Sequence, residues 1–547
     1  MDTRAHSREW QLYDYIIIGG GSAGCVLANR LSEDPDARVL LLEAGPRDWH
    51  PFIHMPAGLA KLVGQKGVNW NYDTAPERHL DNRALWWPRG KVLGGSSSIN
   101  AMCYIRGVPG DYDEWAALGA HGWSWKDVLP YFRRSESNSR VPLPGPGERD
   151  FRALHGDIGP LSVSDLRYVN PLTHVFIEAA AQAGVPGNTD FNGPVQSGAG
   201  LYQVTQKNGA RASTAVAYLD PVRHRANLTV VTGAQVGRIT FEGHRASGVV
   251  YTCNGRAFHQ PAVREVLLCG GAINSPQLLM LSGIGPADEL RRHGIDVQAD
   301  APEVGANLQD HLDICTVHHS TQRITYDRVS DARVAFDYYL RGHSGPGSSN
   351  LAEGGAFLRS RHAPDARCDI QMHFVPAMLE DHGRHRLQGD GYTLHACALR
   401  PHSRGRIRLA SASAGDKVRI EANYLSDADG FDARMMLECA RVSRDILMQP
   451  AFKPFRGEPV FPARNDCSDA ELEAYVRAKA ETVYHPVGTC RMGSDEAAVL
   501  DPQLRVRGVE GLRVVDASVM PRLIGGNTNG PTIMIAERAA DLIVGRA

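Results

Sequence analysis

The sequence lacks long hydrophobic runs, a marked excess of charge of either sign, and paired cysteines. No apolar run is long enough to span a bilayer, and the formal net charge is −2. Neither a nucleic acid nor an anionic surface is therefore indicated as the main partner. Residues 1–14 are charged and have no apolar core, so a signal peptide is not expected. These absences predict a cytoplasmic protein, with peripheral association at the inner membrane left open.

Cysteine and histidine give no sign of a metal centre. The ten cysteines form no C-x-x-C pair, which argues against a structural zinc site and a disulfide framework. His373, His382 and His385 lie in one short segment and could be ligands, but their spacing does not resemble a zinc site. A solvated or pocket-lining loop is expected there, and no metal is predicted.

The strongest local pattern lies near the N-terminus. Residues 13–18 form an apolar, β-branched run that is typical of a buried parallel strand. A G-x-G-x-x-G motif follows, in which the glycines permit a tight turn, close approach to a pyrophosphate, and close packing of the next helix. That helix, predicted over residues 22–32, would point its amide end at phosphates. The three glycines are Gly19, Gly21 and Gly24.

A second apolar strand at residues 39–42 ends at an acid. Glu43 lies 19 residues after Gly24, where a carboxylate can accept a hydrogen bond from a ribose hydroxyl. Strand, glycines, helix, strand and acid in this order predict a dinucleotide site. A purely structural βαβ turn is the alternative interpretation.

Other segments repeat the strand–turn–helix pattern or suggest different local structures. Residues 89–100, RGKVLGGSSSIN, could run along a cofactor or form a surface turn. Residues 265–286 predict a strand, a turn and a helix that starts at Ser275-Pro276, with Pro276 at the first helical position. Residues 512–545 repeat that order. Residues 227–252 predict a three-stranded meander.

We therefore predict an α/β protein with two domains, because 547 residues exceed one ordinary core. One is a doubly wound, Rossmann-like domain that binds the cofactor, and the other is a substrate domain of antiparallel sheet and helices. A loop at Pro142–Gly147 is expected near a domain seam. The cofactor domain takes residues 1–160, 201–313 and 482–547, and the substrate domain takes 161–200 and 314–481.

Five motifs together resemble the glucose–methanol–choline (GMC) oxidoreductase family over essentially the full chain. They are IIIGGGSAG, GKVLGGSSSIN from Gly90, GGAINSPQLLMLSGIGP from Gly270, VGANLQDH from Val304, and YHPVGTCRMG from Tyr484 with NTNGPT from Asn527. Within the family the chain is most similar to the bacterial alcohol, polyethylene-glycol and L-sorbose dehydrogenases.

The resemblance implies FAD as the cofactor of the N-terminal site. Val236 would contact the adenine, Asp516 and Ala517 the ribityl–pyrophosphate region, and Pro531 and Thr532 the isoalloxazine. The residues expected along the flavin and pyrophosphate are Gly94, Gly95, Ser96, Asn100, Ala101 and Met102. Further cofactor-binding positions are Gly19, Gly21, Ser22, Ala23, Gly24, Glu43, Ala44, Arg89, Gly90, Val92, Gly270, Tyr484 and Asn529.

The resemblance also implies a catalytic pair and the mode of flavin attachment. His485 and Asn529 would face the flavin, which fits a His/Asn subgroup because many members carry a second histidine instead. Ile99 stands where some choline-oxidising members attach the flavin to a histidine. A noncovalent FAD is therefore expected.

The expected chemistry is oxidation of the CH–OH group of a primary aliphatic, polyol or glycol-like alcohol to an aldehyde or ketone. The flavin N5 would accept the hydride, which no side chain can do. A histidine with an ordinary pKa of about 6.5 can serve as the base at neutral pH, a role we expect for His485. Asn529 would orient the hydroxyl, and a quinone-type acceptor would take the electrons.

Three alternatives are left open. Oxygen could be the acceptor, as in an alcohol oxidase, or the chain could resemble a flavin-containing hydroxynitrile lyase. A non-catalytic nucleotide sensor would leave the motifs around His485 and Asn529 unexplained. Glu353 could face the pocket and favour a cationic substrate, but a structural carboxylate paired with arginine is the preferred interpretation.

Overall fold

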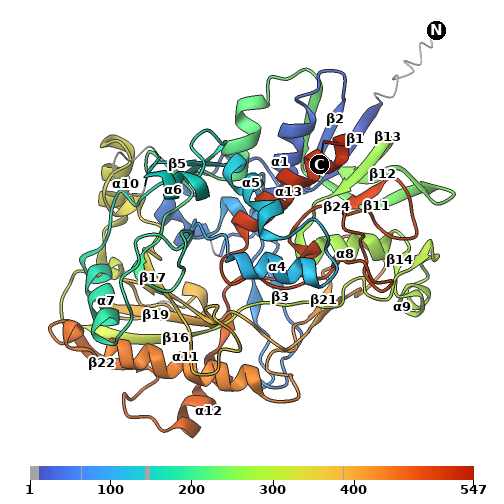
Figure 1. Cartoon of the computed structure of the whole chain (residues 1–547). Coiled ribbons are helices and arrows are strands. Elements are labelled where there is room, and N and C mark those ends of the chain that lie inside the picture. The colour runs from blue at the N-terminus through green and yellow to red at the C-terminus, as the bar shows by residue number, and fades with distance from the viewer. Residues whose placement is uncertain (1–11, 63, 142–147, 386, 547) are drawn as a thin grey trace.

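The computed structural model describes residues 12–62, 64–141, 148–385 and 387–546 and is built around two seven-stranded sheets (Figure 1). The first sheet has the order β10-β2-β1-β13-β12-β11, and β24 pairs with β13. The second has the order β22-β16-β19-β18-β17-β7, and β23 pairs with β16. The expected loop at Pro142–Gly147 lies outside the described residues.

The first sheet forms around the N-terminal apolar run. β1 is buried between β2 and β13, and all three run parallel, with Ile16 opposite Leu40 and Val266. Continuous apolar residues suit these strands because both faces of a parallel sheet are covered. The bounds are β1 Tyr13–Ile18, β2 Val39–Glu43, β10 Leu228–Thr232, β11 Ala234–Glu242, β12 Arg245–Cys253, β13 Arg256–Leu268 and β24 Leu512–Val514.

Two helices far apart in the sequence cover this sheet side by side. α1 (Ser22–Leu31) packs against α13 (Asn529–Val544), as Figure 1 shows next to β1. Arg30 on α1 pairs with the buried Glu537 on α13 at 2.8 Å. The N- and C-terminal segments therefore build one layer, and they bring the glycine turn close to the start of α13.

The second sheet is antiparallel throughout. In Figure 1, α11 (Phe431–Leu447) runs along it beside β16, and α7 (Pro171–Gln182) packs at its other end. The fold class is confirmed, with a Rossmann-like part and an antiparallel substrate sheet. The strands are β7 Gly198–Leu201, β16 Leu312–Ser320, β17 Gly354–Leu358, β18 Ile370–Val375, β19 Gly391–Ala398, β22 Arg456–Phe461 and β23 Glu481–Thr482.

Two local predictions were wrong. The meander is β11-β12-β13, whereas β10 leaves it to pair in parallel with β2, because its apolar residues extend the buried sheet. The helix expected to begin near Pro276 is α8, Gly271–Leu281, and Pro276 lies inside it. The turn at Gly270 and Gly271 starts the helix directly, since Gly271 adopts a φ of +78°.

Further elements complete the structure. The additional α-helices are α2 Pro51–His54, α3 Leu59–Leu62, α4 Pro109–Ala117, α5 Trp125–Ser135, α6 Glu148–Leu154, α9 Ala287–Arg292, α10 Asp331–Leu340 and α12 Asp469–Lys479. Short strand pairs are β3 Tyr72–Asp73 with β4 Trp86–Trp87, β5 Glu136–Asn138 with β6 Leu161–Val163, β8 Gln206–Lys207 with β9 Ala210–Arg211, β14 Ile284–Gly285 with β15 Ala299–Asp300, and β20 Arg406–Arg408 with β21 Arg419–Glu421.

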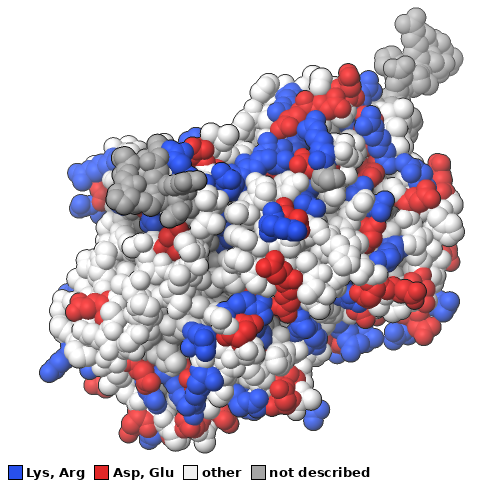
Figure 2. Space-filling model, in the orientation of Figure 1, with Lys and Arg blue, Asp and Glu red and all other residues white. Residues whose placement is uncertain are grey.

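The surface and the helix lengths agree with the composition. Figure 2 shows acidic and basic side chains interspersed over the visible face, in keeping with the small net charge. Within the described ranges, none of the helices combines the length and apolar character needed to cross a bilayer.

Candidate active site

One cavity of about 470 Å³ collects most of the residues that the sequence singled out. It extends from the glycine turn after β1 to the segment around His485, so both sheets contribute to its wall. The predicted site residues that line it are Gly19, Gly21, Ser22, Ala23, Glu43, Ala44, Arg89, Gly90, Gly95, Ser96, Asn100, Ala101, Met102, Val236, Gly270, Tyr484, His485, Asp516, Ala517, Asn529 and Thr532.

Four predicted cofactor residues do not line this cavity: Gly24, Val92, Gly94 and Pro531. Gly24 serves helix packing, because a Cβ there would lie 1.9 Å from the Gly19 oxygen. Gly94 serves a turn with a φ of +84°, and its Cβ would lie 2.2 Å from Ser98 Oγ. Val92 and Pro531 are buried. These residues shape the wall from behind.

The glycine turn leaves a cradle, an open space next to the start of α1. A Cβ on Gly21 would meet nothing closer than the Gly95 Cα at 3.9 Å, so the space in front of this residue is free of protein. Gly21 is also the N-cap residue of α1, and because it has no side chain it does not cap the first amides of the helix. The first amides of the helix therefore remain available for an anion.

Glu43 ends β2 and lines the cavity, and the sequence predicts a ribose contact for this residue. Its two carboxyl oxygens accept hydrogen bonds from the backbone N–H groups of Gly20 and Gly45, both at 2.7 Å. Burial raises the pKa of this carboxyl to about 7, against the effect of those hydrogen bonds. Each oxygen keeps a second lone pair for a ligand hydroxyl. Cradle, helix terminus and acid together fit an adenine dinucleotide such as FAD.

His485 lies at the other end of the cavity between two polar side chains. Its Nδ1 lies 2.9 Å from the Nδ1 of His311, and its Nε2 lies 3.2 Å from the Nδ2 of Asn527. Burial, reinforced by the nearby histidines and Arg89, lowers the pKa of His485 well below its ordinary value. The imidazole is therefore neutral at physiological pH and able to accept a proton.

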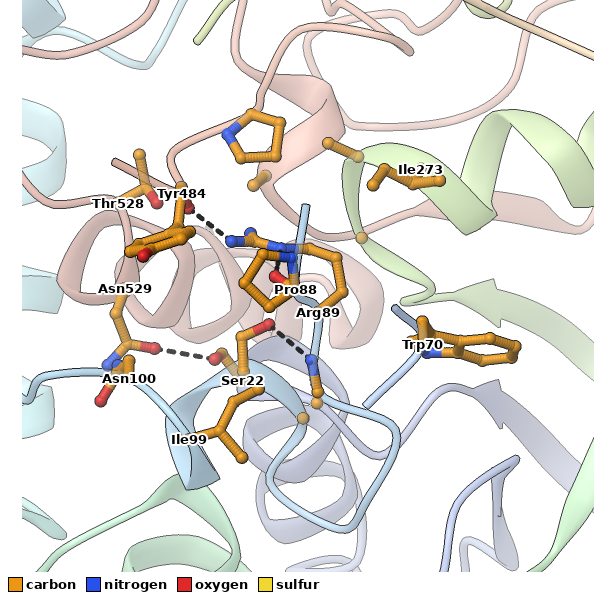
Figure 3. Close-up of a pocket in the computed structure, with 18 of the residues that line it drawn as sticks. Ser22, Trp70, Pro88, Arg89, Ile99, Asn100, Ile273, Tyr484, Thr528 and Asn529 are labelled. Atoms are coloured by element: carbon orange, nitrogen blue, oxygen red, sulfur yellow. Dashed lines mark hydrogen bonds between the residues drawn. The ribbon is translucent and has the colours of Figure 1, made fainter. Parts of the chain in front are cut away.

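Asn527 and Asn529 both line the cavity with His485, and the one that contacts the imidazole is Asn527. Asn529 is the first residue of α13, and its Oδ1 accepts a hydrogen bond from Ser22 Oγ at 2.8 Å, as the dashed line in Figure 3 shows. Asn527 instead accepts from Gln371 Nε2 at 2.9 Å, which turns its amide nitrogen toward His485. The NTN motif was the only signal for Asn527, because the sequence does not reveal which asparagine the turn presents.

The residue before His485 holds the loop against the cofactor side of the cavity. Tyr484 has a φ of +73°, and its carbonyl accepts from Arg89 Nη2 at 2.8 Å (Figure 3). Asp310 accepts the backbone N–H of His485 at 2.7 Å. These contacts fix the loop on both sides of the imidazole, and sequence reasoning had missed Asp310.

The substrate end of the cavity is mostly apolar. Its polar members include His373 on β18 and His395 on β19, which are opposite each other across the two strands. Burial lowers the pKa of His373 to about 4. Burial also opposes charge on His395, but the nearby Asp313 outweighs it and raises that pKa. The apolar lining residues here are Leu351, Ala352, Val375, Leu379 and Val483.

Two acidic groups outside the wall have partners within the protein. Asp313 Oδ2 pairs with His395 Nδ1 at 2.6 Å, next to Cys315, while its Oδ1 is buried without a hydrogen-bond partner. Glu353 accepts from the Asn170 amide at 2.8 Å and from three hydroxyls, those of Thr173, Ser349 and Tyr326. Glu353 is thus structural, although its observed partners are an amide and hydroxyls rather than the expected arginine.

The chain matches known proteins over nearly its whole length. The GMC oxidoreductase family model matches residues 13–313 and, in its C-terminal part, 401–536. The alcohol dehydrogenase [acceptor] of Pseudomonas putida is 49% identical, covering 97% of this chain and 96% of that protein. The mitochondrial choline dehydrogenase of Homo sapiens is 46% identical, covering 98% and 90%.

Solved structures of related oxidoreductases also match this chain over nearly its whole length. Pyridoxine 4-oxidase from Mesorbium loti superimposes with a TM-score of 0.86 at 33% identity, covering 96% of this chain and 98% of that one. A variant of formate oxidase from Aspergillus oryzae gives a TM-score of 0.89 at 29% identity, covering 97% of this chain and 98% of that one. Fold and site thus define an FAD-dependent oxidoreductase that acts on CH–OH donors. The chain belongs to the GMC oxidoreductase family, as its motifs predicted.

Proposed function

We propose that this protein oxidises a neutral, primary aliphatic alcohol to the aldehyde, with His485 as the base and a quinone-type compound as the electron acceptor. The carrying observation is the neutral His485 imidazole, which lines the cavity with its Nε2 on the side of Asn527. Bound FAD would supply the hydride acceptor. The residues of the chain then have to orient the alcohol, exclude water and take up the proton.

The proton transfer is assigned to one atom. The alcohol O–H would donate to Nε2 of His485, a geometry that general-base catalysis requires. The Asn527 amide, which donates to Nε2 in this structure, would be displaced from that atom by the alcohol and donate to the alcohol oxygen instead, where it would stabilise the charge that develops. Asn529 is proposed to contact the cofactor instead, because its side chain bonds to Ser22 at the start of α1. This revises the pairing of His485 with Asn529.

The lining favours an uncharged substrate. The carboxylates among the described lining residues are Glu43 and Asp516. Asp516 accepts from Gly271 N and Ser275 Oγ at 2.8 and 2.6 Å, so both acids belong to turns of the first sheet. Glu353 is occupied by its four donors and does not line the cavity. At the His485 end a quaternary ammonium group would therefore find no carboxylate among the described lining residues, and Asp313 behind the wall is paired with His395. This argues against choline, although the choline dehydrogenases are nearly as similar in sequence as the alcohol dehydrogenase.

The acceptor is inferred from relatives. The Pseudomonas protein carries "[acceptor]" in its name, whereas others at 46% identity are named oxygen-dependent choline dehydrogenases. Oxygen is therefore the second candidate. Peripheral attachment to the inner membrane, where quinones reside, stays a prediction that fractionation of cells would test.

A two-stage experiment tests the proposal. Purified, FAD-loaded protein is mixed anaerobically with 1-alkanols of increasing length, with glycols and with choline. The loss of flavin absorbance at roughly 450 nm is followed. We expect the fastest bleaching with a 1-alkanol. Faster bleaching with choline would refute the substrate assignment, and no bleaching by any alcohol would favour the lyase-like alternative. The reduced protein is then mixed with a water-soluble quinone or with oxygen, and faster reoxidation by oxygen would refute the acceptor.

A further inference from the structure

We propose that His311 is a positioning residue that fixes the tautomer of His485, so that the lone pair of Nε2 faces the substrate. This inference rests on the proposed role of His485 as the base. His311 precedes β16 and is fully buried, at 0% exposure. It is absent from the residues that line the cavity, so it would act through His485 alone.

Three groups in a row, the Leu399 carbonyl and the rings of His311 and His485, determine where the protons lie. His311 Nε2 lies 3.2 Å from the carbonyl oxygen of Leu399, and His311 Nδ1 lies 2.9 Å from Nδ1 of His485. A carbonyl only accepts, so Nε2 of His311 must carry the proton. A neutral His311 then has a bare Nδ1, which accepts the Nδ1–H of His485. The lone pair of His485 is left on Nε2.

The opposite assignment fails at the carbonyl. If His311 donated from Nδ1, its bare Nε2 would face the Leu399 oxygen as a second acceptor, which leaves both buried acceptors unsatisfied. A doubly protonated His311 could donate to both partners. Burial opposes that form, however, and lowers the pKa of His311 to about 3. Both hydrogen bonds therefore form with one pair of tautomers, in which His311 carries its proton on Nε2 and His485 carries its proton on Nδ1.

A series of hydrogen bonds reaches His485 from the other side and agrees with this tautomer assignment. Tyr202 donates its hydroxyl proton to the Met372 oxygen at 2.7 Å, so its oxygen is free to accept from Gln371 Nε2 at 3.2 Å. Gln371 also donates to Asn527 Oδ1, which leaves the Asn527 amide as a donor toward Nε2 of His485. Because the Asn527 amide donates, Nε2 of His485 has to be the acceptor and must carry no proton. The hydrogen bond from His485 Nδ1–H to His311 gives the same result.

The backbone around His311 makes this arrangement rigid. Gln309 and Val487 exchange two backbone hydrogen bonds at 3.1 and 2.9 Å. Between them, Asp310 accepts the His485 amide, and the Val483 amide donates to the His311 carbonyl at 3.1 Å. The two imidazole rings meet edge to face at an interplanar angle of 88°. The segment 309–311 therefore holds both the backbone and the ring of His485.

The test compares two substitutions at one position. His311→Leu removes the acceptor, so His485 can place its proton on Nε2 and lose its basic atom. We expect flavin reduction per bound FAD to fall about 10–10³-fold, which is less than the roughly 10⁴-fold cost of a catalytic histidine held in the wrong tautomer. His311→Asn keeps an acceptor near the position of Nδ1 and should recover at least about tenfold of the loss. His311→Phe, which keeps the ring contact, replaces His311→Leu if that protein does not fold.

A matched control separates tautomer from packing. His318 is another buried histidine of this region, on β16, and does not line the cavity. His318→Leu should leave the rate within about threefold. The rate loss in His311→Leu should also shrink for the 2-fluoro analogue of the best alcohol, because a more acidic hydroxyl depends less on the base. A merely structural defect would slow both alcohols equally.

Two results would overturn the inference. One is a His311→Leu protein that reduces its flavin within about threefold of the parent, and the other is an equal loss for both alcohols. His485→Ala, measured in parallel, separates this from the proposed function. If His485→Ala is slow while His311→Leu is not, the positioning role alone fails. If His485→Ala keeps the parent rate, the proposed base itself is wrong.

Discussion

Nε2 of His485 lies 3.2 Å from the amide nitrogen of Asn527, while Asn529, two residues further on, bonds to Ser22 on the first helix. The turn before α13 and the first residue of that helix thus present two asparagines to separate partners, Asn527 to the proposed base and Asn529 to Ser22 at the start of α1. The two residues can be distinguished by experiment.

Asn527→Ala and Asn529→Ala should therefore have different effects. Asn527→Ala removes the donor beside the base, and we expect flavin reduction to slow about 10–10³-fold with FAD retained. Asn529→Ala should weaken FAD binding more than it slows reduction per bound FAD. Single-turnover reduction and flavin content, measured on both proteins, check this. The reverse order of rate losses would restore Asn529 to the catalytic pair.

Two glycines of the fingerprint should separate folding from binding. In Gly24→Ala the new methyl would lie 1.9 Å from the Gly19 oxygen, so we expect a loss of about 3 kcal/mol or more in folding stability. In Gly21→Ala the nearest atom is 3.9 Å away, so the apoprotein should melt like the parent and bind little FAD. Thermal melts and released flavin give the readouts. Normal FAD content in Gly21→Ala would disprove the cradle.

Glu43→Gln tests the ribose contact without changing size. The glutamine offers one acceptor oxygen, and its NH₂ group would face the N–H of Gly20 or Gly45, donor against donor. We expect FAD affinity to fall about 10–100-fold, or roughly 1.5–3 kcal/mol. Titration of the apoprotein with FAD measures this. An unchanged dissociation constant would show that Glu43 only holds its own turn.

The pH profile should report the environment of His485. Because burial lowers its pKa well below about 6.5, the base remains unprotonated as the pH falls through that value. Flavin reduction should therefore stay near its plateau through about pH 6.5 and decline only at more acidic pH. Rapid-mixing rates across the acid range provide the profile. A midpoint at or above about 6.5 would contradict the buried, neutral imidazole.

The sequence predicted the parts that local physics controls. In the structure the apolar runs form the paired parallel strands β1 and β2. Gly19, Gly21 and Glu43, at the ends of these strands, line one cavity. His311, Gln371 and Asn527 could not be found in this way. His311 and Asn527 contact His485, and Gln371 contacts Asn527, only because β18, the segment 309–311 and the turn before α13 converge. Such distant contacts leave no periodic pattern. The family motifs did include His311 and Asn527, but motif membership does not give orientation.

The central claim is that His485 takes the hydroxyl proton, and its most direct test is the rate of anaerobic flavin bleaching by alcohol in His485→Ala. The substitution leaves the glycine cradle untouched, so FAD should remain bound. General-base catalysis is worth about 10²–10⁴-fold, or roughly 3–5 kcal/mol, and we expect a loss in that range per bound FAD. A His485→Ala protein that retains FAD and bleaches within about threefold of the parent rate would remove His485 from the mechanism.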